Sequence, residues 1–399
     1  MRTVYFDYNA TTPLDPDVRE AMLPFLGDLY GNPSSVHHVG RRARAWLDEA
    51  HERAARVLGC RPSELLFTSG GTEANNLAIV GAARALRAKG RHLLTSSVEH
   101  AAVLRCFKNL AAREDFHLTL LPVGRAGVVD PNDVAGALRP DTILVSVMSA
   151  NNETGIRQPI REIARLCHER GLMFHTDAVQ SFGKEDAVRA AGFGADLMAL
   201  CPHKFHGPKG IGLLCIRTPL QIQPLLAGGP QENDRRPGTE NLAGIAGLVR
   251  AMELFLVPPI FGRSDLSPCT RLLERELTQV EGVHVIGSAA SRLANTVSFA
   301  VEGTDSIALL AALDLQGICA SSGSACSAGS VEPSHVLNAM GYPPALASSF
   351  VRFSLGREST EEEAAFVASR WPELIERLRR NAGKEDVNNL PTRGNSVCE

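Results

Sequence analysis

Short apolar runs, separated by stretches with helical periodicity, follow one another between residues 64 and 216 and restrict the fold more than any other feature of the chain. The runs span residues 64–68, 92–96, 118–122, 142–148, 172–176, 197–200 and 211–216. Because they are apolar at consecutive positions, both faces of each strand must be buried. Strands of this kind that alternate with helices are typical of a mostly parallel sheet covered by helices on both faces. The sequence therefore predicts an α/β fold, in which ligands bind beyond the carboxyl ends of the strands.

The helical periodicity is interrupted at residues 257–264, which contain two prolines and a glycine and follow a helix expected to begin near Thr239. We place a domain boundary there, with a large ligand-binding domain at 15–257 and a smaller α+β domain at 258–380. The smaller domain has expected helices at 268–280, 305–316 and 361–379 and expected strands at 294–301 and 349–355. Residues 1–14 are expected to pack with the small domain, and the polar residues 381–399 to be disordered.

The composition argues against several classes of protein. A formal net charge of -3 gives no electrostatic reason to expect nucleic acid or an anionic membrane as a partner. No apolar run reaches membrane-spanning length. The chain has 9 cysteines without paired metal-ligand spacing and no secretory signal before Tyr5, so we expect free thiols and a cytoplasmic location.

One of these cysteines, Cys326, lies in residues 321–330, where every other side chain is small. Such a stretch supplies no apolar bulk and predicts an exposed, flexible loop that carries a thiol. The thiol is either an ordinary small residue or a reactive group, and reactivity requires a lowered pKa or a partner group. The choice depends on what else the chain carries.

The turn Thr-Ser-Gly-Gly-Thr-Glu at 68–73 joins an expected strand to an expected helix at 74–88. Glycines in such a turn let backbone amides point at an anion, and the start of a helix favours negative charge. The turn therefore predicts a phosphate seat. A glycine-rich turn with Ser69 or Thr72 as helix cap explains the pattern equally well.

A second polar segment, at 175–180, ends another expected buried strand. Strand alternation places His175 and Asp177 on one face, so that both can converge on a ligand beyond the strand end. A buried carboxylate there is costly without a cationic partner. The alternative is that Asp177 caps the next helix.

The third segment is Cys-Pro-His-Lys-Phe-His-Gly-Pro-Lys-Gly at 201–210, directly after another apolar strand. Lys204, at the strand end beside His203, is well placed for Schiff-base chemistry, because desolvation and nearby cationic or aromatic groups lower the pKa of an amine. Lys209 is either a surface lysine or a phosphate contact.

Together the three segments require a ligand with a phosphate, an aromatic cation that needs a carboxylate, and an aldehyde that needs an amine. Pyridoxal 5'-phosphate (PLP) has all three groups. The alternative is a metal-dependent hydrolase that uses a site formed by His175, Asp177, His203 and His206. That alternative leaves Lys204 and the glycine-rich turn unexplained.

Ordered motifs from Tyr5 to about Glu363 resemble the cysteine desulfurases of the nitrogen-fixation and iron–sulfur-cluster type, which are fold-type I, aminotransferase-like PLP enzymes. The matching motifs lie at 7–13, 32–35, 68–76, 99–100, 151–155, 175–180, 203–204, 231–239, 321–330 and 352. The resemblance implies that Lys204 binds the aldehyde covalently and later moves the Cα proton, that Asp177 pairs with the pyridinium nitrogen, and that His100 stacks on the ring and transfers protons.

The same resemblance implies further contacts with the cofactor and the substrate. Asn152 and Gln180 would hydrogen-bond near the ring hydroxyl. The phosphate would be held by a set of residues around the glycine-rich turn, namely Gly71, Thr72, Cys201, His203 and, across a homodimer interface, Thr239 of the partner subunit. Cys201-Pro202 departs from the family's usual serine followed by a small residue, and a thiol is a weaker donor than a hydroxyl. The substrate would be bound by Asn9, Asn152 and Arg352, with the arginine on the carboxylate.

The implied activity is conversion of L-cysteine to L-alanine, with transfer of the sulfur to Cys326 as a persulfide. A sulfur-acceptor or iron–sulfur scaffold protein would then receive the sulfur for iron–sulfur cluster or other thio-cofactor assembly. A selenocysteine lyase or related PLP lyase is the nearest alternative. A non-catalytic sulfur-transfer scaffold is disfavoured by the intact set of Lys204, Asp177, His100 and Cys326. Cys398 is either a secondary sulfur-accepting thiol or a chance cysteine near the chain end.

Overall fold

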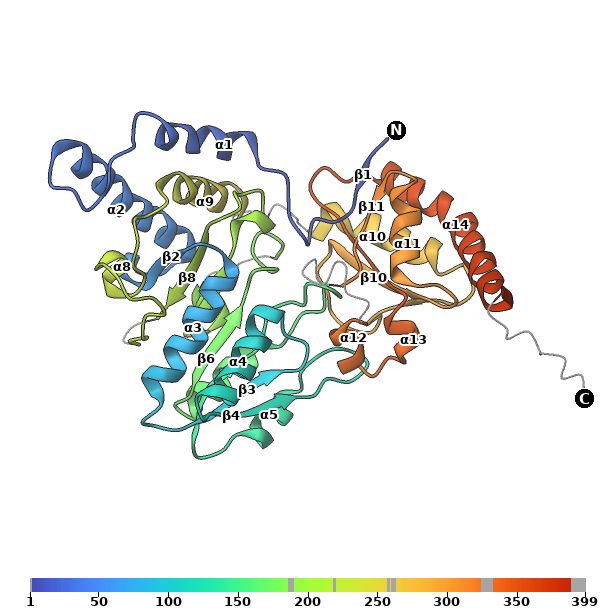
Figure 1. The fold of residues 1–399 in the computed structure, drawn as a ribbon, viewed down its shortest axis with the longest axis horizontal. Coiled ribbons are helices and arrows are strands. Elements are labelled where there is room, and N and C mark those ends of the chain that lie inside the picture. Colours follow the sequence, from blue (N-terminus) through green and yellow to red (C-terminus); the bar gives the residue numbers. More distant parts are fainter. Residues whose placement is uncertain are drawn as a thin grey trace, which may run out of the picture.

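A mostly parallel sheet forms the centre of the large domain in the computed structural model, which describes residues 2–185, 190–217, 220–256, 259, 263–323 and 333–388 (Figure 1). Within these residues it has seven strands, in the order β2 (Leu65–Thr68), β8 (Gly212–Ile216), β7 (Leu197–Leu200), β6 (Met173–Asp177), β5 (Thr142–Ser146), β3 (His92–Ser96) and β4 (His117–Leu121). Strand β8 runs antiparallel to both of its neighbours, and the other pairs are parallel.

Both faces of this sheet are buried along six of its strands, as the unbroken apolar runs require, whereas the edge strand β4 is partly exposed and does not meet that expectation. Leu65 and Phe67 belong to one hydrophobic core, whereas Leu66 between them belongs to another, because successive side chains of a strand point to opposite faces. The first core includes residues of α2 (His38–Leu58), α6 (Ile160–Glu169) and α9 (Leu242–Phe255), and the second includes residues of α3 (Gly71–Leu86) and α4 (Ala101–Arg113). The predicted α/β fold class is confirmed.

Short helices complete the large domain. They are α1 (Pro16–Met22), η1 (Leu23–Leu26), η2 (Pro62–Glu64), α5 (Pro131–Ala137), α7 (Ala190–Phe193), η3 (Pro202–Lys204) and α8 (Gln231–Asp234). Helix α1 packs on α9 and starts where Asp15 accepts hydrogen bonds from the backbone N–H groups of Asp17 and Val18.

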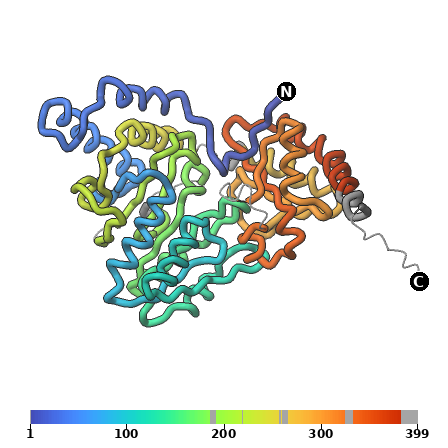
Figure 2. The backbone as a smooth tube through the Cα atoms, viewed as in Figure 1, coloured from blue at the N-terminus to red at the C-terminus, as the bar shows by residue number. Residues whose placement is uncertain are grey.

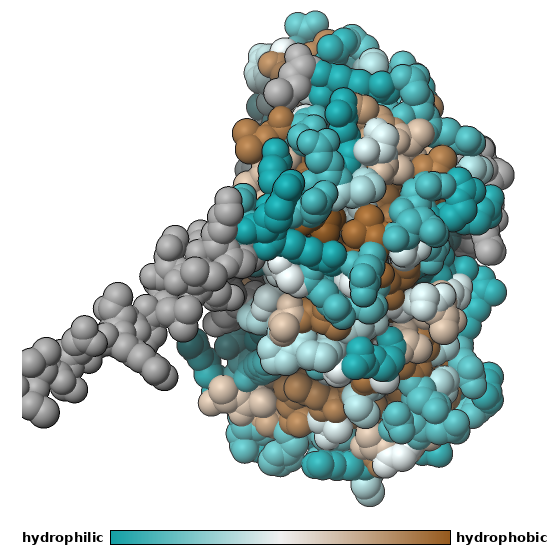
Figure 3. All heavy atoms as spheres, turned by 90° about the vertical axis from the view of Figure 1, so that its right-hand side faces the viewer, coloured by the Kyte–Doolittle hydropathy of each residue, from teal (hydrophilic) through white to brown (hydrophobic). Residues whose placement is uncertain are grey.

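The small domain has its own sheet and its own core. Its three antiparallel strands within the described residues are β12 (Phe350–Ser354), β10 (Thr296–Val301) and β9 (Val283–Val285). Its helices are α10 (Arg263–Leu277), α11 (Ser306–Asp314), α12 (His335–Ala339), α13 (Pro344–Ala347) and α14 (Glu361–Asn388). The rings of Phe299, Phe353 and Trp371 contact one another in the core. Hydrophilic side chains predominate on the outer face of this domain (Figure 3).

The first residues of the chain lie against the small domain before the chain crosses to the large one (Figure 2). Strand β1 (Val4–Tyr5) pairs in parallel with β11 (Ile318–Cys319), and Asp7 forms a bridge to Ser354 at the end of β12. The segment that follows Asp7 therefore starts at the boundary between the two domains. The candidate site lies at this boundary.

The structure differs from the sequence-based expectations at several element ends. Helix α10 begins at Arg263, before the expected residue 268. Helix α14 continues to Asn388, so residues 381–388, which we expected to be disordered, are helical. Only Ala, Lys and Glu among these eight residues favour helices, so the stretch has little helix signal of its own and continues the helix that precedes it. Strands β1, β9 and β11 were not predicted because two or three residues are too few to show a period.

No helix in the described part of the chain is long and apolar enough to cross a membrane. Each cysteine in the same part of the chain has a free thiol.

The aromatic core predicts that Trp371→Ala destabilises the small domain by about 3–5 kcal/mol, because a large buried side chain is lost and a cavity remains. The ring is 1% exposed. The measurement is the urea midpoint followed by circular dichroism. Leu315→Ala is the control, because that side chain is 71% exposed and should leave the midpoint unchanged. Equal midpoints for the two variants would contradict the assigned core.

Candidate active site

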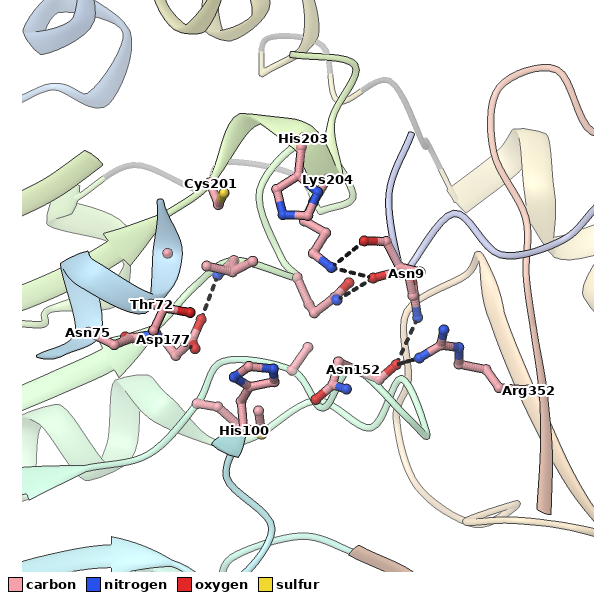
Figure 4. Close-up of a pocket in the computed structure, with 16 residues that line it drawn as sticks. Asn9, Thr72, Asn75, His100, Asn152, Asp177, Cys201, His203, Lys204 and Arg352 are labelled. Atoms are coloured by element: carbon pink, nitrogen blue, oxygen red, sulfur yellow. Dashed lines mark hydrogen bonds between the residues drawn. The ribbon is translucent and has the colours of Figure 1, made fainter. Parts of the chain in front are cut away.

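A cavity of about 230 Å³ lies beyond the carboxyl ends of the large-domain strands and reaches Arg352 of the small domain (Figure 4). It brings together most of the residues predicted from the sequence, namely Asn9, Gly71, Thr72, His100, Asn152, Asp177, Gln180, Cys201, His203, Lys204 and Arg352. Thr239 is exposed and does not line the cavity. Cys326 and the rest of residues 324–332 lie outside the described residues, as does Cys398.

One end of the cavity is formed by the start of α3. Its cap residue, Gly70, makes no side-chain hydrogen bond to the helix, so the first N–H groups are left for a ligand. A Cβ atom at Gly71 would lie 3.1 Å from Cγ2 of Val179, and one at Gly212 would lie 2.5 Å from the backbone of Gly70. Glycine at these positions lets the turn sit close to β8. A neighbouring depression of about 410 Å³ shares Thr72 and His203 with the cavity and is also lined by Lys209.

Asp177 lies at the end of β6, where both of its carboxylate oxygens accept hydrogen bonds. Oδ2 accepts from Nδ2 of Asn75 at 2.7 Å, and Oδ1 accepts from the backbone N–H of Val179 at 3.0 Å. The side chain thus caps a turn, and not the helix that our alternative interpretation named, and it also lines the cavity. Asn75, three residues after Thr72 on α3, also lines the cavity and was not singled out as a site residue, because its bond to Asp177 joins positions far apart in the sequence.

Lys204 follows β7 in η3, and its amine points into the cavity. Nζ donates to the backbone carbonyls of Asn9 and Ala10, both at 2.7 Å. Burial disfavours the charged amine, and the positive charge of Arg352 acts in the same direction, so the pKa of Lys204 falls to about 8. A much larger fraction of this amine than of an ordinary lysine is therefore unprotonated and nucleophilic near neutral pH.

His100 is the cap of α4, and this role defines which of its nitrogens carries the proton. Nδ1 accepts a hydrogen bond from the backbone N–H of Ala102 at 3.1 Å. Burial lowers the pKa of His100, so the ring is neutral and its proton is on Nε2. His203 is also neutral, because burial and the nearby Lys204 lower its pKa to about 3.

Arg352 on β12 has an almost fully buried guanidinium with a carboxylate partner. Nη2 donates to Oδ1 of Asp7 at 2.6 Å, and Nη1 donates to the backbone carbonyls of Asn152 at 2.8 Å and Gly323 at 3.2 Å. Gly323 is the last described residue before the segment that contains Cys326. Arg352 therefore connects the cavity to the N-terminal segment through Asp7, and to the beginning of the Cys326 segment through Gly323.

The expected convergence of His175 with Asp177 on a ligand is wrong. His175 is fully buried, its Nδ1 lies 2.8 Å from Oγ of Ser146, and burial lowers its pKa to about 3. The two side chains share a face, but His175 lies two residues back from the strand end, where the neighbouring strand β5 covers it. His206 is also turned away from the cavity, with Nδ1 3.0 Å from the carbonyl of Pro13.

The histidines and Asp177 therefore do not form the metal site weighed from the sequence. Across the described ranges, no group of three or more His, Cys, Asp or Glu side chains is arranged to hold a metal ion.

Cys201 lines the cavity where the family usually has a serine. Its thiol donates to the carbonyl of Ile211 at 3.5 Å, and burial raises its pKa, so it remains protonated. The thiol proton of Cys201 is thus used in a bond to the backbone and not directed at the cavity. The N–H groups at the start of α3 and the hydroxyl of Thr72 are better placed than this thiol to donate to an anion in the cavity.

The residues present fit PLP on the chemistry of their donors. One end of the cavity offers helical N–H groups without a side-chain cap for a phosphate. The side offers a hydrogen-bonded carboxylate for a protonated ring nitrogen, and Lys204 offers an amine of lowered pKa for an aldehyde. The neutral ring of His100 lines the same space.

Comparisons with known proteins agree with this chemistry. The family described as aminotransferase class-V matches residues 4–367. A protein of Dictyoglomus turgidum named cysteine desulfurase IscS is 45% identical over 383 residues, covering 95% of this chain and 96% of that protein. A protein of the same name from Methanosarcina thermophila is 44% identical over 379 residues, covering 95% and 93%.

Solved structures resemble the chain over most of its length. The structure of a NifS-like protein has a TM-score of 0.87 and 35% identity, covering 94% of this chain and 100% of that chain. A structure described as SspA in complex with cysteine has a TM-score of 0.78 and 34% identity, covering 90% and 100%.

The lowered pKa of Lys204 predicts how fast its amine reacts in cofactor-free protein. The rate of acetylation should rise through a midpoint at about pH 8, because only the unprotonated amine reacts. Peptide mass spectrometry at a series of pH values measures the rate, and N-acetyl-lysine measured in parallel is the control. A midpoint near the ordinary lysine value of 10.5 would contradict the assigned environment.

Proposed function

The chain belongs to the class-V aminotransferase family and is a PLP-dependent cysteine desulfurase, and we propose that Cys326 receives the sulfur of L-cysteine as a persulfide. The observation that carries the proposal is the meeting, in one cavity, of an amine with a pKa of about 8, a carboxylate held by two donors, and an uncapped helix start. This combination serves a phosphorylated aromatic aldehyde and is difficult to explain otherwise.

Each cavity residue has a proposed role in holding the cofactor. The α3 start, Thr72 and His203 bind the phosphate, and Asp177 pairs with the ring nitrogen. Asn75 keeps the carboxylate of Asp177 directed at the cavity. Asn152 and Gln180 line the region assigned to the ring hydroxyl.

Bound PLP supplies an electron sink that makes loss of the substrate Cα proton possible. Lys204 accepts that proton at Nζ and is suited to it, because an amine with a pKa near the working pH both takes up and releases protons. His100 presents the N–H group of Nε2 to the cavity, because its Nδ1 accepts the bond from Ala102, and it can therefore hold a reacting group by donating a hydrogen bond.

The sulfur transfer balances when Cys326 is the nucleophile. Its thiolate attacks the substrate sulfur, so that an S–S bond forms as the substrate Cβ–S bond breaks. The electron pair of the broken bond stays with the substrate carbon, which takes up a proton and leaves as the methyl group of alanine. A thiolate is required because it is the nucleophilic form of cysteine.

Arg352 is the proposed site of the substrate carboxylate. Its guanidinium offers donors in a planar fork that matches a carboxylate. Nε of this guanidinium has no partner among the described residues, and Nη2 has a second N–H beside the one bonded to Asp7, so an incoming carboxylate can bind there. Asn9 is the third proposed substrate contact. Its side-chain Nδ2 donates to the carbonyl of Asn152 at 3.2 Å, so it positions the residue that Arg352 also contacts.

We further propose a homodimer in which Thr239 of the partner subunit reaches the phosphate. The exposure of Thr239 and the open depression beside the phosphate end support this arrangement. A sulfur-acceptor protein then takes the persulfide sulfur for iron–sulfur cluster or other thio-cofactor assembly. Free thiols throughout the described residues support action in the cytoplasm.

The assigned nucleophile predicts that Cys326→Ser binds PLP and L-cysteine but releases alanine at least about 100-fold more slowly, because serine does not supply a thiolate. The measurements are the visible spectrum of bound PLP with and without L-cysteine, alanine release, and peptide mass spectrometry for added sulfur. Cys60→Ser is the matched control, since Cys60 is a partly exposed free thiol that does not line the cavity.

Persulfide formation at the normal rate in Cys326→Ser would refute the assignment. A comparison of alanine release from L-cysteine and L-selenocysteine tests the substrate itself, because a selenocysteine lyase would show little turnover of cysteine.

A further inference from the structure

Lys184 is a buried lysine next to the cavity that neither the sequence motifs nor the proposed reaction uses. It lies two turns after β6 and is 4% exposed. Its Nζ donates to Oε1 of Gln180 at 2.6 Å and to Oδ1 of Asn9 at 2.7 Å. Both partners line the cavity, whereas Lys184 does not. Lys184 therefore contacts two cavity-lining residues without lining the cavity itself.

The contact with Lys184 defines how the amide of Gln180 is oriented. A charged lysine amine has donors only, so it must meet the oxygen of the amide. The other end of the amide agrees, because Nε2 donates to the backbone carbonyl of Asn9 at 3.1 Å. A neutral amine could accept a hydrogen bond, but the flipped amide would then turn Oε1 onto the Asn9 carbonyl oxygen. The orientation thus holds in either protonation state of Lys184.

The same amine orients Asn9. With Oδ1 held by Lys184 and by Nδ2 of Asn295 at 3.1 Å, the Nδ2 group of Asn9 donates to Oγ1 of Thr296 at 2.9 Å. The backbone carbonyl of Asn9 is left to accept from Gln180 and from Nζ of Lys204. Lys184 and Lys204 therefore share Asn9 as a hydrogen-bond partner, Lys184 through the side chain of Asn9 and Lys204 through its backbone carbonyl.

We propose that Lys184 is a positioning residue that presents the N–H group of Gln180, and not its oxygen, to the cavity, so that the ligand atom there is an anionic oxygen. This inference rests on the proposed function, in which that atom is the ionised ring oxygen of PLP. An amide N–H bonded to this oxygen stabilises its negative charge.

The charged groups around Lys184 come from several elements. Lys204 of η3 and Arg352 of β12 are like charges, and Glu185 is an opposite charge. Burial and the two like charges hold the pKa of Lys184 well below its usual range. Around Lys204 itself the facing groups are Arg352, Cys201, Asp7 and Asp177.

The proposal predicts the direction in which loss of Lys184 shifts the pH midpoint of the visible absorption band of bound PLP. A donor on the ring oxygen withdraws electron density, and any positive charge on Lys184 repels a proton, so both lower the proton affinity of the nearby Lys204 nitrogen. Removal of Lys184 should therefore raise the pH midpoint of the spectral change.

The experiment compares purified wild type, Lys184→Met and Ser181→Ala, each loaded with PLP, in spectral titrations across pH. We expect the midpoint to rise by about one pH unit in Lys184→Met and the PLP dissociation constant to rise about tenfold, the effect of one lost hydrogen bond. Ser181 is the matched control, because it is buried in the same segment and bonds to Ser149 at 2.6 Å. Its variant should leave the midpoint unchanged.

If the Lys184→Met variant folds and binds PLP but its pH midpoint is unchanged, the inference is overturned. If that variant does not fold, Gln180→Met removes the same donor while Lys184 stays, and an unchanged midpoint there overturns it as well. Wild-type protein that shows no visible band with PLP would instead overturn the proposed function, so the two failures are distinguishable.

Discussion

The structure of the site depends on the hydrogen bonds of one buried side chain, Asn9. Its amide accepts from Lys184 of the large domain and from Asn295 of the small domain, and donates to Asn152 and Thr296. Its backbone carbonyl accepts from Lys204. A residue of the N-terminal segment therefore fixes both domains relative to the amine that binds the cofactor. Each of these polar groups would be costly to bury without its partner, so the loss of one bond affects the others.

The second constraint is the concentration of positive charge beside this network. Lys184 and Arg352 are buried and Lys204 is half-buried, and Asp7 and Asp177 are the carboxylates that line or border the same space. Burial and the positive charge of Arg352 lower the pKa of Lys204 to about 8. The environment that makes the amine reactive is thus the same one that suits an anionic, phosphorylated ligand.

The sequence predicted the sheet because a strand buried on both faces must be apolar at consecutive positions, as Leu65, Leu66 and Phe67 are. It predicted Asp177 and Lys204 because each follows such a strand directly. It was wrong about His175, since alternation gives the face of a side chain but not whether a neighbouring strand covers it. Asn75 and Lys184 were missed because they act through Asp177, Gln180 and Asn9, and such contacts join positions far apart in the sequence.

The central claim is that the cavity binds PLP covalently through Lys204. Borohydride reduction of the PLP-loaded protein, followed by peptide mapping with mass spectrometry, tests it most directly, because reduction makes the bond to the lysine permanent. The account predicts the pyridoxyl group on the peptide that contains Lys204. Its recovery on Lys184 or Lys209, or on no lysine, would contradict the account.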